Sequence, residues 1–458
     1  MSVVYYIKKN QIGKSGLGNI KQQLKKEYKM RKIFAVALVF LFAKNIAFSQ
    51  SELIQINNEK EFRKLAEATI YDGNSFYGKR IELTHDIVLL GDSILPIGVV
   101  PDADITVPFQ GEFDGLGHTI TIKAPFYTYF SFIEEEWGYS RFVQSGLFGF
   151  IGRAGIVKNL NIIVENTQLC IGNALGQIGS FGVIAAMNAG IIMNCNVDGK
   201  YSIIGPLDNF YEYGTITGTL TSEGYICSCS SDVDLNTNKI SIVGGLVGKS
   251  ESGLISKSYN TGDIIIEECT SFGGDGRCVG GIVGQNYGTT DKLSPYVLNC
   301  INYGKIVTNE NVISAGGVVG VCMRDGMIFY CGNVGDILSD AQYVGGVVGR
   351  LINSSLYGSY QAGCLYDSSA KKIKNEVIGI CWWGNEPTKN NYIIGNCNKN
   401  VTPEFFVQKA NAYYPKAESI LLEYLQADKK LHSVYYMPKP WIISSQKLFP
   451  YLDYDITN

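Results

Sequence analysis

Short apolar phrases recur along the chain at intervals of about 30 residues. The first phrase is a glycine, two apolar residues and then a glycine or small residue, as in Gly245-Leu246-Val247-Gly248. It begins at Gly146, Gly182, Gly218, Gly245, Gly281, Gly317, Gly346 and Gly379, with intervals of 36, 36, 27, 36, 36, 29 and 33 residues. Self-similarity at this period predicts a solenoid, a propeller or another repeat array.

Two more phrases follow in each unit. About ten residues on comes an apolar residue, two further residues and then Cys, Ser or Leu. This phrase begins at Val157, Ile192, Ile226, Ile255, Val297, Ile328, Leu356 and Ile394. A third phrase, such as Gly304 with Ile306, is a glycine followed two positions later by an apolar residue. No phrase is long enough for a helix, so we predict an all-β fold in which three short strands form each coil of a single parallel β-helix. Units of 27–29 residues are too short for propeller blades.

The cysteines fit this arrangement. The second phrase places Cys195, Cys229, Cys300, Cys331 and Cys397 at one inward position, which Ser258 and Ser359 share. Spacings of about 30 residues and the absence of neighbouring histidines argue against zinc, so we predict a structural stack. Cys269 and Cys278 flank a glycine-rich turn and are the candidate disulfide.

The two ends of the repeat region resemble caps. Asn58 followed by an amphipathic stretch to Ala66 predicts a short helix with an asparagine N-cap. Thr402-Pro403-Glu404 predicts a helix start, and Ala417–Leu425 a second helical stretch. We expect these capping helices to cover the exposed strand edges.

Charge and hydropathy separate residues 1–50 from the rest. They hold ten basic residues and one acidic residue, whereas the remainder has 29 basic and 41 acidic residues, which disfavours nucleic-acid binding. Met30-Arg31-Lys32, the apolar run Ile33–Ala43 and Ala47-Phe48-Ser49 match the three parts of a secretory signal peptide. We therefore predict an upstream extension (1–29) with Met30 as the true start, a signal peptide (30–49), an N-terminal cap (50–78), the β-helix (79–400) and a C-terminal cap or tail (401–458).

These phrases resemble GLUG-motif repeats of exported bacterial proteins. The resemblance rests on GGLVG, GLISKSYNTGDI and VLNCINYGKI, and on the upstream segment from Lys79 to Ile120 that ends in FDGLGHTI. It covers residues 55–398, although the units at Gly182 and Gly218 lack the second glycine. It implies a right-handed β-helix at the cell surface, in the extracellular space or in the periplasm. Some relatives carry an IgA-cleaving metallopeptidase domain, but His85, His118 and His432 form no HExxH pair here.

The most unusual segment is Pro125–Phe142, which contains eight aromatic residues around three glutamates. Its candidate ligand-binding residues are Tyr129, Glu135, Trp137 and Tyr139, and the alternative is that the segment packs on the flank of the coil. A second candidate is Trp382-Trp383, which we place where the unit's second glycine would stand. Asp114 with His118, and Asp232 with Asp234, are considered for catalysis or cation binding, but turn and solvated-edge roles fit them better.

Two hypotheses of function follow. The first is a non-catalytic, adhesin-like binding protein, exported and monomeric, that contacts a glycan or a host or cell-surface protein. The second is a carbohydrate-active β-helix enzyme, a polysaccharide lyase or glycoside hydrolase. We expect no cofactor, no metal site and no membrane span after signal cleavage. Three or more polar or acidic side chains in a groove across adjacent coils would favour the enzyme.

Overall fold

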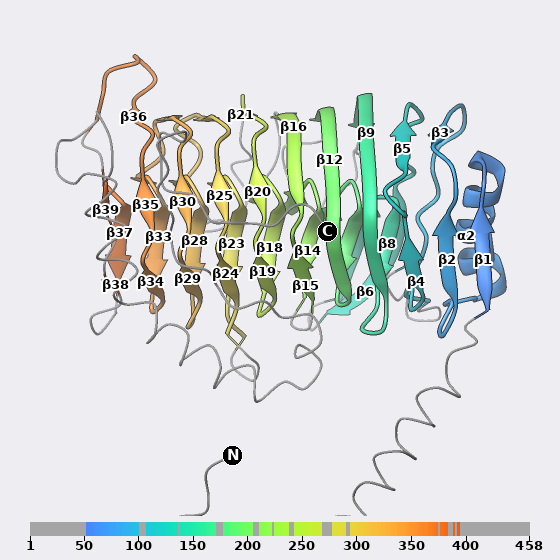
Figure 1. Cartoon of the computed structure of the whole chain (residues 1–458). Helices are drawn as coiled ribbons and strands as arrows, with labels where there is room; N and C mark the ends of the chain where they lie inside the picture. The colour runs from blue at the N-terminus through green and yellow to red at the C-terminus, as the bar shows by residue number, and fades with distance from the viewer. Residues whose placement is uncertain are drawn as a thin grey trace, which may run out of the picture. The chain divides into compact units, whose positions relative to one another are not determined.

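Parallel strands dominate the computed structural model (Figure 1). It describes residues 52–99, 107–135, 138–170, 177–204, 210–221, 224–237, 242–267, 277–289, 294–373, 376–382, 388–389 and 392–393. From Leu53 onward these residues belong to one compact unit. The strands form three sheets whose named strands pair in parallel from coil to coil, apart from one antiparallel hairpin, so the predicted all-β parallel β-helix is confirmed.

The large sheet has 23 strands and holds the second and third phrases. Its strands are β1 (Leu53–Ile56), β2 (Arg80–Leu83), β3 (Ile87–Leu89), β4 (Glu112–Asp114), β5 (Thr119–Ile122), β9 (Ile156–Cys170), β12 (Ile191–Ile204), β15 (Tyr225–Cys227), β16 (Ser230–Thr237), β19 (Leu254–Ser256), β20 (Tyr259–Asn260), β21 (Ile264–Ile266), β24 (Tyr296–Leu298), β25 (Ile301–Asn302), β26 (Ile306–Thr308), β29 (Met327–Phe329), β30 (Gly332–Asn333), β31 (Ile337–Ser339), β34 (Ser355–Tyr357), β35 (Tyr360–Gln361), β36 (Leu365–Tyr366), β38 (Thr388–Lys389) and β39 (Tyr392–Ile393).

Two eight-stranded sheets, here named wall 1 and wall 2, hold the first phrase. Wall 1 is β6 (Tyr129–Glu135), β7 (Gly138–Ser145), β10 (Gln177–Phe181), β13 (Phe210–Gly214), β17 (Ile242–Gly244), β22 (Cys278–Gly280), β27 (Ser314–Gly316) and β32 (Tyr343–Gly345). Wall 2 is β8 (Phe148–Ile151), β11 (Ala185–Asn188), β14 (Thr217–Leu220), β18 (Val247–Glu251), β23 (Val283–Tyr287), β28 (Val319–Met323), β33 (Val348–Ile352) and β37 (Ile378–Trp382).

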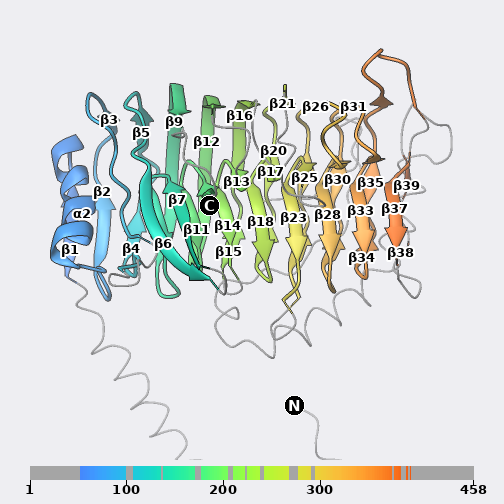
Figure 2. The ribbon, with the colours of Figure 1, turned by 180° about the vertical axis from the view of Figure 1, so that it is seen from behind.

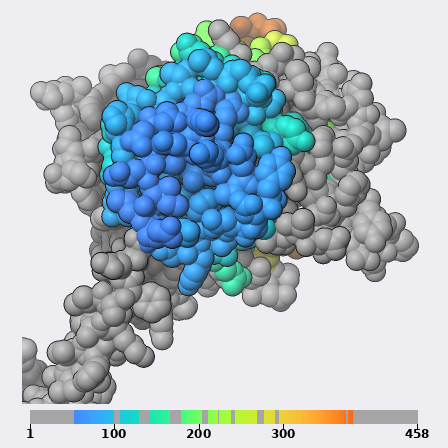
Figure 3. Space-filling model, turned by 90° about the vertical axis from the view of Figure 1, so that its right-hand side faces the viewer, coloured from blue at the N-terminus to red at the C-terminus, as the bar shows by residue number. Residues whose placement is uncertain are grey.

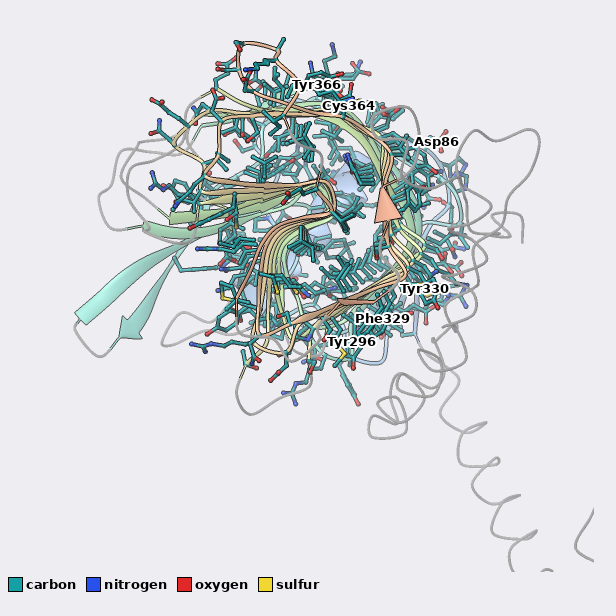
Figure 4. The ribbon with its side chains drawn as sticks, turned by 90° about the vertical axis from the view of Figure 1, so that its left-hand side faces the viewer. Asp86, Tyr296, Phe329, Tyr330, Cys364 and Tyr366 are labelled. Carbon is teal, nitrogen blue, oxygen red and sulfur yellow. The ribbon has the colours of Figure 1, made fainter. Side chains whose placement is uncertain are left out.

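The walls form a V whose apex points into the coil. Seen along the axis, both walls run toward the middle of the coil and meet at a sharp corner there (Figure 4). The corner is the first phrase itself, so Ile282 and Val283 are both fully buried in the main core, as are Val318 and Val319. In a continuous strand only one residue of each pair would face the core, but a corner inserted into the core buries both.

Strand pairing corrects the repeat register in three units. Phe148, Ala185, Thr217, Val247, Val283, Val319, Val348 and Ile378 are equivalent in successive coils. The intervals are therefore 37, 32, 30, 36, 36, 29 and 30 residues. Gly182 therefore aligns with Gly244, which directly precedes the first glycine of its phrase, so the alignment by sequence pattern is one residue off in this unit. Gly218 aligns with Gly248 and Gly379 with Gly349, which are second glycines of the phrase, so the alignment is three residues off in these two units.

The second phrase is in register as predicted, except in the last unit. Leu356 pairs with Thr388 and Tyr360 with Tyr392, so Ile394 and Cys397 do not hold the equivalent positions. Elsewhere the phrase bends at a residue with φ between 50° and 58°, directly before the inward Cys or Ser. These corner residues are Asn194, Ser228, Lys257, Asn299, Tyr330 and Gly358. This corner splits the second phrase into two short strands, and the corner of the V separates a wall 1 strand from a wall 2 strand. The coil from Ile242 to Ile266 therefore carries five strands instead of three.

The predicted stack of cysteines and serines is confirmed in the described coils. Cys195, Cys229, Cys300 and Cys331 are buried. Each thiol donates to the carbonyl two residues earlier at 3.3 Å. Ser258 and Ser359 donate to the same carbonyl position at 2.8 and 3.1 Å. This shared hydrogen bond explains why either Cys or Ser can occupy the position. Burial raises the pKa of the Cys229 and Cys300 thiols, which keeps them protonated.

A ladder of side-chain amides, here named the amide ladder, crosses the core behind the apex. Asn260 Nδ2 donates to Asn302 Oδ1 at 3.0 Å, Asn302 to Asn333 at 2.8 Å, and Asn333 to Gln361 Oε1 at 2.8 Å. Each amide also donates to a glycine carbonyl two residues later. All four side chains are buried, and the ladder gives each of their amide nitrogen atoms a partner in its own or the next coil.

The amide ladder explains the first glycine of the phrase. A Cβ on Gly281 would lie 2.3 Å from Asn302 Cγ, and one on Gly317 would lie 2.2 Å from Asn333 Cγ. Where the ladder position holds Val197 or Ser231 instead, the glycine position holds Val183 or Thr215. In these two coils the glycine and the amide are both missing, whereas the coil of Gly146 keeps the glycine although Ile162 stands at the ladder position.

We expect Asn302→Ala to lower the free energy of unfolding by about 2–3 kcal/mol, because it leaves two buried amide groups short of a partner. Asn260→Ala should cost less, because Asn260 is the first member and its Oδ1 accepts no hydrogen bond. Guanidinium unfolding of both variants measures the difference. Equal losses would contradict a directional ladder.

The N-terminal end is covered by α2 (Glu59–Asp72). The Asn58 side chain accepts from Glu61 N at 3.1 Å, and Gly73 ends the helix at φ 66°. Phe62 and Leu65 pack on the first coil, with the Phe62 and Phe113 ring centroids 6.2 Å apart. A helix stands where the sequence predicts one, and it is longer than the sequence suggested. The N-terminal residues cover this end of the solenoid (Figure 3). The helices expected near Thr402 and over Ala417–Leu425 lie outside the described residues.

Candidate functional site

The aromatic segment forms an antiparallel hairpin at the N-terminal edge of wall 1. β6 pairs with β7, with Tyr129 opposite Gln144 and Glu135 opposite Gly138. β7 in turn pairs in parallel with β10. The hairpin projects from the coil (Figure 4) and lies beside the first coils (Figure 2). Trp137 lies outside the described residues, as do the side chains of Tyr129, Glu135 and Tyr139. Binding by this segment therefore stays a prediction.

The second candidate lies on the other wall. Trp382 ends β37 and pairs with Ile352, whereas Gly379 aligns with the second glycine, Gly349. The expectation that Trp382-Trp383 replaces that glycine is therefore wrong, because the unit was aligned three residues too late. Trp383 lies outside the described residues. The structure places the two candidates on the two arms of the same V, at opposite ends of the axis.

A half-exposed row follows the open side of the V on wall 2, and we name it the mouth row. It consists of Glu251, Tyr287, Met323 and Ile352, which pair in successive coils, and the backbone of Trp382 pairs with Ile352 in the next coil. Lys249 Nζ lies 5.9 Å and Arg324 Cζ lies 4.7 Å from the centroid of the Tyr287 ring. One aromatic ring is thus flanked by two cations on an accessible face.

Deeper in the V lies a cluster of charged and hydroxyl side chains. Glu212 on wall 1 faces Lys249 on wall 2 at 3.4 Å, and Lys249 also contacts Glu251 at 2.6 Å. Thr219 donates to Glu212, and Ser180 lies 2.8 Å from the Thr219 hydroxyl. Glu212 is only 6% exposed, so this ion pair joins the two walls inside the V.

The environment shifts the titration of both partners. Burial raises the pKa of Glu212, and the nearby Lys249 ammonium only partly offsets it. Burial by itself would lower the pKa of Lys249, but the carboxylates of Glu212 and Glu251 outweigh it and the net shift is upward. Sequence reasoning missed this pair. Its signal was one acidic residue in the apolar strand FYEYG, which pairs with Ile242 in the next coil, and one lysine in VGKS, which pairs with Gln285.

Further along the axis the inside of the V contains both apolar and charged side chains. Ile242, Cys278 and Val321 form a small cluster separate from the main core, with Met323 packed against it. Arg350 is 1% exposed and its guanidinium lies 5.9 Å from the Tyr343 ring centroid. The V is therefore a packed junction in which buried charged groups such as Glu212 and Arg350 lie among apolar side chains.

The other acidic candidates are held in structural bonds. Asp114 is buried and accepts from Leu116 N at 3.0 Å and Asn159 Nδ2 at 2.9 Å, while Arg80 and Lys158 contact it at 3.3 Å. His118 bonds to Asp86 instead, at 3.1 Å. The other pair links neighbouring coils: Asp232 accepts from the Thr261 hydroxyl at 2.7 Å and Asp234 from Asp263 N at 3.2 Å.

The cysteine chemistry differs in part from expectation. Cys278 is buried in β22, and its proposed partner Cys269 lies outside the described residues. Cys364 is disulfide-bonded, which the sequence analysis did not predict. Its phrase gave no signal, because Cys364 stands in a corner between Gly363 and Leu365.

Small-molecule and membrane features are limited in the part that the structure describes. A pocket of about 210 Å³ lies between α2 and residues 92–95, below the ~300 Å³ typical of ligand sites. Arg63 ties this loop to α2 by donating to the Leu90 and Asp92 carbonyls at 2.8 Å.

Within the described residues, no group of three or more His, Cys, Asp or Glu side chains could hold a metal ion. In the same residues, no helix is long and apolar enough to cross a bilayer.

Comparison with known proteins gives only structural likenesses. No protein-family model and no curated protein matches this chain. One similar solved structure is described as "a putative immunoglobulin A1 protease from Bacteroides ovatus", with 17% identity, a TM-score of 0.46 and coverage of 80% of this chain and 88% of that one. Another is "IgA1 Protease", with 16% identity, a TM-score of 0.41 and coverage of 76% of this chain and 22% of that one. Likenesses this distant carry no conclusion about activity.

Proposed function

We propose that this chain is an exported, non-catalytic β-helix that binds an extended glycan or surface protein along the mouth row. The observation that carries the proposal is the accessible row Glu251, Tyr287, Met323 and Ile352, which repeats in register over four coils. Neighbouring strands lie ~4.8 Å apart, so four positions span about 14 Å. A linear ligand along the axis would contact each coil in turn.

Three features support export and the family assignment. Residues 30–49 have the layout of a signal peptide. Cys364 is in a disulfide, which suits an oxidising compartment. The repeat phrases resemble GLUG-motif repeats, and the described coils account for each phrase structurally. We propose on these grounds that the chain is a GLUG-type surface, extracellular or periplasmic protein.

A glycan array combined with immobilised cell-surface proteins tests the binding function. We expect Tyr287→Ala to reduce retention on the ligand at least about tenfold, while stability changes by no more than ~0.5 kcal/mol, as is usual for surface positions. Tyr303→Ala is the matched control, because Tyr303 is 44% exposed on the large sheet. If Tyr303→Ala reduced retention and Tyr287→Ala did not, the mouth row would not be the binding site.

The same experiment tests the hairpin through a separate variant, Trp137→Ala. If the aromatic segment contacts the ligand, Trp137→Ala lowers retention and leaves the melting temperature unchanged. If it only packs on the coil, the melting temperature falls and retention is unaffected. Loss of retention in both Trp137→Ala and Tyr287→Ala would indicate a ligand that spans both walls.

A carbohydrate-active enzyme is the second candidate, and one observation favours it. Glu212 is a buried carboxyl group with a raised pKa, and it shares Lys249 with a second carboxylate, Glu251. Its bonds to Thr219 and Lys249 fit a structural role better. A reducing-end release assay on the same glycans distinguishes the two functions: turnover that is lost in Glu212→Gln would establish the enzyme.

A further inference from the structure

One outward face of the large sheet is apolar and buried. On its strands Ile226, Ile255, Val297 and Ile328 point into the main core, so their neighbours face away from it. These neighbours, here named the flank patch, are nevertheless at most 4% exposed: Tyr225, Cys227, Leu254, Ser256, Tyr296, Leu298 and Phe329. Outward residues with this burial must be covered by another segment of protein.

Other outward positions of the same sheet show the contrast. Val88 is 42% exposed and Ile163 is 38% exposed, although both are apolar. The patch also has borders, since Met193 at one end and Met327 and Tyr357 at the other are half-buried. In the first coils the same rows hold charged residues such as Glu82, Asp114 and Lys158. The covered footprint therefore extends over β15, β19, β24 and β29.

The aromatic side chains of the patch are ordered by stacking. The Tyr296 and Phe329 ring centroids are 6.2 Å apart with planes at 12°, and Phe329 and Tyr357 are 5.1 Å apart at 14°. Tyr296, Phe329 and Tyr330 lie together on this flank (Figure 4). Burial raises the pKa of Tyr296, in keeping with a face that excludes water.

We propose that the C-terminal segment, residues 401–458, docks on the flank patch and so covers the side of the solenoid rather than its end. The chain leaves the solenoid from β38 and β39, and β38 continues the strand row that carries the patch. Five strand spacings of ~4.8 Å separate β38 from β15, or about 24 Å. A helix of about 16 residues spans that distance, and the segment has 58 residues.

The sequence of the segment has a matching apolar face. Leu421 and Leu425 lie four residues apart in the predicted helical stretch, so they would share one side of a helix. The N-terminal segment is less suited to cover the flank patch. Residues before Leu53 connect to β1, next to the coils that carry the charged residues Arg80 and Glu112. An apolar helix face suits the apolar patch and not the charged rows.

Cys227 provides a native reporter, because its thiol lies in the flank patch and is 1% exposed. The test is N-ethylmaleimide labelling of the full chain, followed residue by residue by mass spectrometry. We expect Cys227 to be as protected as the inward Cys331, while the exposed Cys381 reacts. In the variant Leu421→Asp with Leu425→Asp, Cys227 should label on the order of tenfold faster. Glu423→Ala is the matched control and should leave Cys227 protected.

A photo-crosslink identifies the occupant directly. With p-benzoylphenylalanine at Leu298, we expect cross-linked peptides from residues 401–458, and none when the probe is placed at Val88. Cross-links from Leu298 to another part of the chain overturn the proposal, as does rapid labelling of Cys227 in the unmodified chain. If N-ethylmaleimide also labels Cys331 rapidly in the double variant, that variant has unfolded. The cross-link from Leu298, made in a chain with no other change, then determines which segment covers the flank patch.

Discussion

Val319→Asp is expected to prevent stable folding. Val319 is fully buried at the apex of the V, where Val283 and Val348 pair with it from the neighbouring coils. A carboxylate there would be surrounded by apolar side chains without a cation or hydrogen-bond donor. Leaving a charge buried and unpaired costs several kcal/mol, which is comparable to the total stability of many domains.

Because both apolar residues of the corner are in the core, Val318→Asp, Ile282→Asp and Val283→Asp should be as damaging. Leu338→Asp is the matched control, since Leu338 is half-buried on the outward side of β31 and should change stability by less than about 1 kcal/mol. Circular dichroism and guanidinium unfolding measure all five variants. Tolerance of Asp at either Val318 or Val319 would show that the apex does not reach the core.

Lys249→Met should be the second most damaging change, with a loss of about 3–5 kcal/mol at pH 7, because it leaves Glu212 buried without its cation. The loss should depend on pH. The pKa of Glu212 in the folded chain is raised above 4.5, its value in the unfolded chain. Ionised Glu212 therefore destabilises the fold as pH rises above 4.5, and the penalty disappears as the carboxyl group is protonated at lower pH.

The difference in unfolding free energy between Lys249→Met and the original chain should accordingly shrink from pH 7 toward pH 4.5. The double variant Glu212→Gln with Lys249→Met is the control, because it has no buried carboxyl group to titrate. Its difference from the original chain should not vary with pH over this range. A constant deficit in the single variant would mean that Glu212 reaches water when Lys249 is removed.

Sequence periodicity predicts the coil well because its apolar positions are determined by the core. Ile192, Ile226, Ile255, Val297, Ile328 and Leu356 pair in order, as the phrase spacing implies. The N-terminal cap is also visible in sequence, since Asn58 and the apolar spacing of α2 are local signals. Capping and core burial act over a few residues, so a single sequence contains them.

The V and its ion pair are not visible in the same way. Gly218 and Gly379 match the first glycine of the phrase by type, yet strand pairing shows that they occupy the second. Either glycine fits a pattern of small and apolar residues, and only contacts between coils distinguish them. Glu212 and Lys249 are 37 residues apart and meet because their strands lie on opposite arms of the V in adjacent coils. The orientation of two sheets is not encoded in local spacing.

The direction of the amide ladder bears on how such a chain can change its length. Each side-chain N–H points to the coil that follows, so a middle member both accepts from the coil before it and donates to the coil after it. A duplicated copy of the coil that carries Asn302 could be inserted beside the original and would find both partners already in place. Gene duplication in units of one coil would thus preserve every amide contact, whereas insertion of a partial unit would break the series. The number of coils can therefore evolve in whole steps while the core pattern stays the same.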